Sequence, residues 1–114
     1  MTAPDDLETV VRSSVSPIEV WGLLNQKPDR LVVVDVRNGP VAFVIRGAIR
    51  IPLHAIASRA NDLPHDRLVV LYSSDSQGDL ATRATVALLS SGFDARQMTG
   101  GISGWRRLKL PVDG

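Results

Sequence analysis

A run of polar residues between a predicted strand and a predicted helix holds most of the side chains that chemistry would need. Where a buried strand leads directly into a helix, several backbone N–H groups lack partners and the helix dipole favours a negative charge. The loop is therefore predicted to bind a ligand or an anion. The alternative is an ordinary connection whose serines and aspartates cap the helix. The loop consists of Ser73, Ser74, Asp75, Ser76, Gln77, Gly78 and Asp79.

Ser73 is the candidate nucleophile, because it is the first residue after the strand. A serine hydroxyl needs an adjacent base to become nucleophilic. His65 precedes the same strand and is expected at the opposite end of the sheet, about 16 Å away at ~3.3 Å per residue. His54 is expected near the correct end but strands away. We therefore favour the interpretation that Ser73 hydrogen-bonds the helix N-terminus and performs no catalysis.

Asp35 and Arg37 follow another buried strand and are candidate supporting residues of the same site. Such a pair can contact a ligand, but it more often joins loops through an ion pair, and we favour that structural role.

The chain has no cysteine, which excludes disulfides, thiolate catalysis and cysteine metal sites. No set of His, Asp or Glu has metal-ligand spacing. We expect neither a metal nor a cofactor.

The elements that position these residues can be predicted from apolar patterning. Residues 31–34 and 68–72 are continuous apolar runs typical of strands buried on both faces, and residues 95–98 form a third candidate strand. Helices are expected from a Ser16–Glu19 capping box to about Lys27, over 54–59, from about 80 to a C-cap at Gly92, and after Gly101. This alternation predicts a parallel sheet with helices on both faces and ligands at its carboxyl edge.

Length and charge narrow the function further. The 114 residues suit one compact domain, which we place at 13–114, preceded by a tail or extension at 1–12. The net charge is +1, from 13 basic and 12 acidic residues, so nothing indicates a nucleic-acid or membrane surface. No apolar run approaches a membrane span, and no secretory signal is present. A cytoplasmic location is the expectation.

Several segments together resemble the rhodanese-like domain family. The segment at 46–52 is similar to the family's Pro-Gly-Ala-Ile-Asn-Ile-Pro run, and residues 69–73 are similar to its strand ending in Tyr-Cys. Residues 100–105 and 110–112 resemble its closing Gly-Gly-Ile-x-x-Trp and Leu-Pro-Val. The matches run from about residue 16 to 112 in the family's order, and they include the Asp-x-Arg element Asp35-Val36-Arg37.

The resemblance implies a three-layer α/β/α fold with a mainly parallel five-stranded sheet. It also implies that the loop after Tyr72 begins where the family has a cysteine that accepts sulfur as a persulfide, the position of Ser73 here. The family's Gly-His pair is Phe43-Val44 in this chain, and its loop motif Gly-x-Arg-Ser is absent. Asp75 and Asp79 add negative charge, so simple divalent anions such as thiosulfate are expected to bind weakly.

Two classes of function remain open. The first is a binding or regulatory module without sulfurtransferase activity, whose partner is an unknown protein or small-molecule ligand at the 73–79 loop. The alternative is a thiosulfate sulfurtransferase whose catalytic cysteine has been replaced by Ser73, naturally or by engineering. A rhodanese-type phosphatase ranks lower, because it would also need the missing cysteine.

Overall fold

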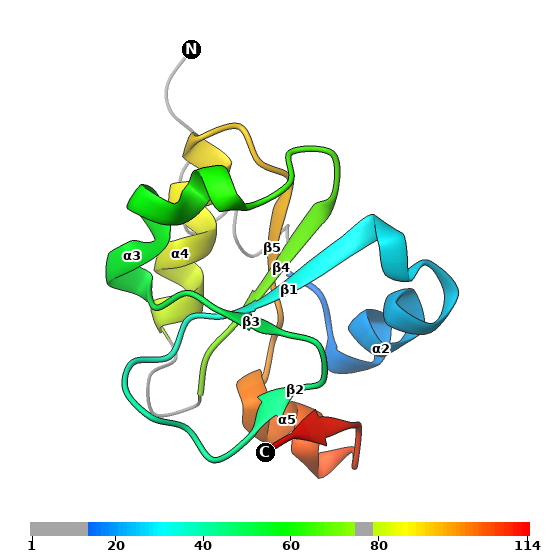
Figure 1. The fold of residues 1–114 in the computed structure, drawn as a ribbon. Helices are drawn as coiled ribbons and strands as arrows, with labels where there is room; N and C mark the ends of the chain where they lie inside the picture. Colours follow the sequence, from blue (N-terminus) through cyan, green and yellow to red (C-terminus); the bar gives the residue numbers. More distant parts are fainter. Residues whose placement is uncertain (1–13, 75–78) are drawn as a thin grey trace.

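The computed structural model describes residues 14–74 and 79–114. Helices and strands alternate along most of this length, as Figure 1 shows. The strands are β1 (Leu31–Asp35), β2 (Val44–Ile45), β3 (Ile49–Arg50), β4 (Leu68–Tyr72), β5 (Ala95–Gln97) and β6 (Val112–Asp113). The helices are α2 (Pro17–Gln26), α3 (Leu53–Arg59), α4 (Asp79–Ser90) and α5 (Gly101–Arg107), with short 3-10 turns at Pro28–Arg30 and Ala60–Asp62.

The central sheet has the order β3-β1-β4-β5, and every neighbouring pair is parallel. This confirms the predicted mainly parallel sheet. Among the described residues, a parallel bridge between Val15 and Met98 adds to this sheet. Ser16 caps α2 directly after Val15, so the pairing does not continue beyond Val15 toward α2. β2 and β6 form a separate antiparallel pair.

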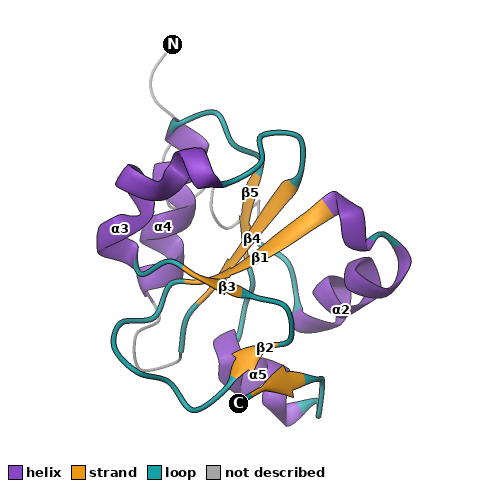
Figure 2. Cartoon of the chain, in the orientation of Figure 1, coloured by secondary structure: helices purple, strands orange, loops and turns teal. Residues whose placement is uncertain are grey.

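Helices cover both faces of the sheet, α3 and α4 on one and α2 and α5 on the other (Figure 2). The alternation of side chains along β4 follows from the period of two in a strand. Val69 and Leu71 belong to the core under α3 and α4. Val70 and Tyr72 belong to the core under α2 and α5. Both faces of β4 are therefore buried, as its continuous apolar run predicts.

Local signals set the helix boundaries. The Ser16 hydroxyl accepts from the Glu19 amide and the Glu19 carboxylate accepts from the Ser16 amide, both at 3.1 Å, which confirms the predicted capping box. Gly92 has the positive φ (+88°) that was expected for the residue ending α4. No helix in the described ranges is long and apolar enough to cross a membrane. All residues of the predicted tail or extension at 1–12 lie outside the residues that the structure describes.

Candidate functional site

Three polar side chains lie in a row across the carboxyl edge of the sheet. The register pairs Asp35, the last residue of β1, with Arg50 on one side and Tyr72 on the other. Asp35 and Tyr72 have no exposed surface. A carboxylate is stable in such a place only when charged groups and hydrogen bonds compensate for its lost hydration. The environment of Asp35 therefore determines what this edge of the sheet can do.

Arg37 supplies the main compensation for Asp35. Its Nη2 lies 2.6 Å from Asp35 Oδ2, and its Nε lies 3.0 and 3.1 Å from the two carboxylate oxygens. The Arg37 backbone N–H also donates to Oδ1, at 2.9 Å. Burial lowers the pKa of Arg37, but the hydrogen bond and charge of Asp35 outweigh it, so the net shift is upward. The ion pair expected from the sequence is thus present, and it is buried.

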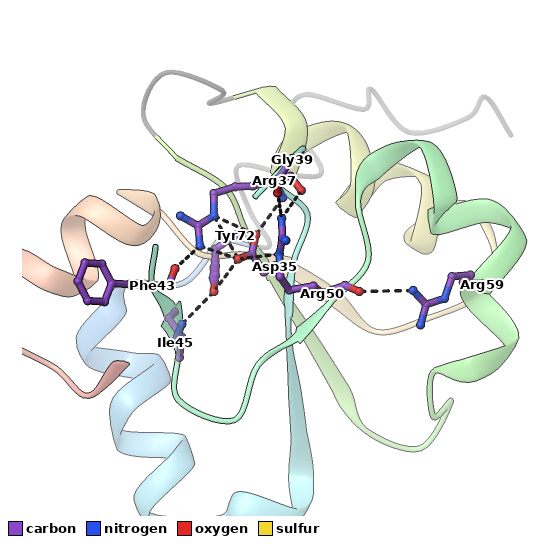
Figure 3. Close-up of polar contacts among 8 residues, drawn as sticks. All are labelled: Asp35, Arg37, Gly39, Phe43, Ile45, Arg50, Arg59 and Tyr72. Carbon is purple, nitrogen blue, oxygen red and sulfur yellow. Dashed lines mark hydrogen bonds and ion pairs between the residues drawn. The ribbon is translucent and has the colours of Figure 1, made fainter. Parts of the chain in front are cut away.

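A second arginine, Arg50, faces the same carboxylate. Its Nε lies 3.7 Å from Asp35 Oδ2, too far for a hydrogen bond, and this buried nitrogen has no hydrogen-bond partner among the described residues. Its Nη2 donates to the carbonyl oxygens of Arg37 (2.9 Å) and Gly39 (2.8 Å). Arg37 Nη2 in turn donates to the Phe43 carbonyl oxygen. Figure 3 shows how these contacts fasten the segment after β1 to the sheet edge.

Tyr72 completes the network from β4. Its hydroxyl donates to Asp35 Oδ2 (3.2 Å) and accepts from the Ile45 backbone N–H (3.0 Å). Burial, together with the negative charge of Asp35, raises the pKa of Tyr72 far above its usual range. The phenol is therefore a neutral hydrogen-bonding group that ties β2 to the sheet, and it supplies no base.

The raised pKa of Tyr72 makes the stability of the domain pH-dependent in alkali. Above about pH 10 an unfolded tyrosine loses its proton while the buried phenol keeps it. The unfolded state then binds fewer protons, so the free energy of unfolding is expected to fall as the pH rises above that value. Tyr72 is the single tyrosine of the chain, so phenolate absorbance reports it alone. Phenolate signal titrating near pH 10 in the folded protein would contradict this prediction.

Ser73 lies at the carboxyl end of β4, at the start of the predicted ligand loop. It is 3% exposed, and its carbonyl oxygen accepts a hydrogen bond from the Ile102 amide at 2.9 Å. Gly101, with φ +58°, packs directly against the Ser73 carbonyl group. Ser74 is half-buried. Of the other predicted loop residues, Asp75, Ser76, Gln77 and Gly78 lie outside the described residues.

Asp79, the last residue of the predicted loop, is the first residue of α4. Its side chain is 74% exposed, and Oδ2 lies 3.9 Å from Arg83 Nη1. Solvent and this neighbouring cation weaken the field that Asp79 exerts on an anion. Asp79 is therefore expected to repel simple anions less strongly than the sequence suggested.

The structure brings neither histidine into the hydrogen-bond network of the site. His65 stacks on Phe93 with ring centroids 4.0 Å apart and lines a cavity with Leu31 and Leu68, the first residues of β1 and β4. This is the amino edge of the sheet, as predicted. His54 lies on α3, which follows β3, and β1 separates β3 from β4. No group of three or more potential metal ligands occurs within the described parts of the chain.

Sequence reasoning missed Arg50 and Tyr72 as members of the network. Arg50 occupies a place where the resembled family segment has asparagine, and that departure was the available signal. Tyr72 was read only as the end of a strand, although a tyrosine hydroxyl buried in a sheet needs a partner. The pairing of Arg50 and Tyr72 with Asp35 depends on strand register, which the apolar pattern does not specify.

Comparison with known proteins places this geometry in context. A family model described as rhodanese-like domain matches residues 16–108. A sulfurtransferase from Allochromatium vinosum is 31% identical over 86 residues, which are 72% of this chain and 78% of that protein. An HTH-type transcriptional regulator from Mycobacterium tuberculosis is 31% identical over 93 residues, 80% of this chain but only 41% of the regulator. The crystal structure of a protein from Lactobacillus plantarum is 31% identical with a TM-score of 0.85, covering 94% of this chain and 92% of that one.

Proposed function

This chain belongs to the rhodanese-like domain family, and from that premise we propose that it is a binding or regulatory module without sulfurtransferase activity. One observation carries the proposal: the chain has no cysteine. Sulfur transfer by this family runs through a persulfide, and a persulfide forms only on a thiol. Ser73 stands at the place where the resemblance puts that thiol, and an alcohol oxygen has no equivalent sulfur chemistry.

Serine catalysis has no support from the surroundings of Ser73. The carboxylate of the network, Asp35, is held by Arg37 and Tyr72, and His65 lies at the opposite edge of the sheet. A base must reach the hydroxyl within hydrogen-bond distance to activate it. The ligand of a non-catalytic module would instead meet the carboxyl edge, near Ser73, Ser74 and the start of α4. An HTH-type transcriptional regulator is among the relatives, and the stretch that it shares with this chain makes up 41% of its length. A stretch similar to this chain is thus part of a regulatory protein, which supports a regulatory role.

The alternative function is a sulfurtransferase whose cysteine has been replaced. The Allochromatium relative supports it, because that protein is described as a sulfurtransferase and shares 31% identity with this chain. Restoring the thiol separates the two proposals. A loop kept for sulfur transfer would regain reactivity, whereas a loop adapted to another ligand would not.

The protein as it stands is expected to gain no sulfur from thiosulfate and to produce no thiocyanate from thiosulfate and cyanide. The physical reason is the absence of any thiol. Intact-mass spectrometry after thiosulfate treatment measures the first result, and a colorimetric thiocyanate assay measures the second. Turnover by the pure protein would overturn the proposal.

The variant Ser73→Cys, treated in the same way, tests the alternative, with Ser74→Cys as the matched control one residue along the loop. The side chains of serine and cysteine are close in size, so the Ser73→Cys protein is expected to fold normally. Ser73 is only 3% exposed, and burial disfavours both a thiolate and the approach of a dianionic donor, so we expect no stoichiometric persulfide. A persulfide on Ser73→Cys but not on Ser74→Cys would favour the replaced-cysteine function.

A further inference from the structure

A cavity of about 370 Å³ lies between the segment after β1 and helix α5. Its volume falls in the range of small-molecule sites. The Ile102 amide, which donates to the Ser73 carbonyl oxygen, belongs to a residue of this cavity. The lining combines two guanidinium groups and a hydroxyl with apolar surface: Arg37, Ala42, Phe43, Ile102, Ser103 and Arg106.

Arg37 presents unused hydrogen-bond donors at this cavity. Its side chain is only 9% exposed, and its Nε and Nη2 are occupied by Asp35 and the Phe43 carbonyl oxygen. Its Nη1 has no hydrogen-bond acceptor within the described residues. In Figure 3 the nitrogen of Arg37 that carries no dashed line points away from Asp35. A guanidinium edge that faces a cavity is suited to an anionic group on a ligand.

Arg106 contributes the second positive charge of the lining. Its guanidinium carbon lies 4.0 Å from the centroid of the Phe43 ring, so the ring holds the guanidinium in a cation–π stack. No carboxylate pairs with Arg106 in the described part of the chain. Asp35 is shared between Arg37 and Arg50, so two guanidinium groups face one buried carboxylate at this edge. The lining of the cavity therefore includes two positively charged side chains and no carboxylate side chain.

We propose that this cavity binds a small organic anion, namely a carboxylate on a planar apolar body. The carboxylate would accept from Arg37 Nη1, the Ser103 hydroxyl and Arg106, while the body packs on Phe43, Ala42 and Ile102. An inorganic dianion such as thiosulfate fits less well, because it would leave the apolar half of the lining without contact. This inference rests on the proposed binding function and specifies the class of its ligand.

Titration with benzoate tests the inference, with benzamide as the neutral molecule of the same shape and sulfate as the anion without an apolar body. Backbone amide shifts in a heteronuclear NMR spectrum locate each ligand. Benzoate is expected to move the amides of Phe43, Ile102 and Ser103 in a saturable way. Benzamide and sulfate are expected to bind at least about tenfold more weakly, because a charge-assisted hydrogen bond or the apolar contact is lost.

The variant Arg106→Gln is expected to weaken benzoate binding about tenfold. Arg107→Gln is the matched control, since Arg107 is the next residue of α5, is exposed and does not line the cavity. Equal affinities of the two variants, or equal binding of benzoate and benzamide, would overturn the inference. Benzoate shifts confined to Ser73, Ser74 and Asp79 would also overturn it, while leaving the proposed function intact. Sulfur transfer in the thiosulfate assay would overturn the proposed function, whereas the benzoate titration tests the ligand class of this cavity.

Discussion

Replacing Asp35 with asparagine is expected to destabilise the domain by about 3–5 kcal/mol, the usual cost of removing one partner of a buried ion pair. Asparagine keeps the size of the side chain and one carbonyl acceptor but removes the negative charge. Arg37, with a side chain only 9% exposed, would then carry an uncompensated charge, and Arg50 would face it without a carboxylate between them. Urea denaturation followed by far-ultraviolet circular dichroism measures the loss.

The matched control is Asp113→Asn. Asp113 pairs with Arg46 at 3.5 Å, but both side chains are more than half exposed, so the expected loss is only about 0–1 kcal/mol. The contrast between the two variants isolates the effect of burial on an ion pair. If Asp35→Asn were no more damaging than Asp113→Asn, the network would have no structural role, and a direct role of Asp35 in ligand binding would become the better interpretation.

The second large effect is expected at Gly101, where alanine should cost about 2–5 kcal/mol from left-handed backbone strain and steric overlap together. Gly101 has φ +58°, a conformation that residues with a Cβ rarely adopt. A Cβ there would overlap the Ser73 carbonyl oxygen and lie 3.2 Å from its carbon. Relief would require Ser73 to move away from the Ile102 amide that it accepts from. Denaturant unfolding gives the magnitude.

Gly92→Ala separates the two causes of that effect. Gly92 also has a positive φ, +88°, but nothing lies within 4 Å of the place where its Cβ would be. Gly92→Ala therefore has the same kind of backbone strain as Gly101→Ala but no steric overlap, so the free energy of unfolding is expected to fall by only about 1–2 kcal/mol. A loss at Gly101 no greater than at Gly92 would show that the start of α5 moves away from Ser73 without cost.

The sequence was sufficient for most of the fold because its signals are local or periodic. The Ser16–Glu19 capping box, the apolar run that becomes β4 and the glycine after α4 each depend on a few neighbouring residues. Beyond the four-stranded sheet, the described residues add a parallel bridge between Val15 and Met98, and the helix cap at Ser16 ends that pairing on its carboxyl side.

The candidate site was harder to predict because it depends on register and on three-dimensional packing. Asp35 and Arg37 were identifiable because they are close in sequence and follow a strand. Arg50 and Tyr72 join them only because β3 and β4 flank β1 in one particular register. The contact between Phe43 and Arg106 links residues far apart in sequence, and no periodic pattern indicates it.

The placement of the two tryptophans has a consequence for optical measurements. Trp21 and Trp105 form an edge-to-face pair with ring centroids 6.2 Å apart; Trp105 belongs to the core under α2 and α5, and the partly buried Trp21 packs against it. The core under α3 and α4 contains Phe93 but neither indole. Intrinsic fluorescence therefore reports on one face of the sheet and is silent about the other. A tryptophan introduced as Phe93→Trp would give the second face its own emission, so that the two halves of the core can be followed separately.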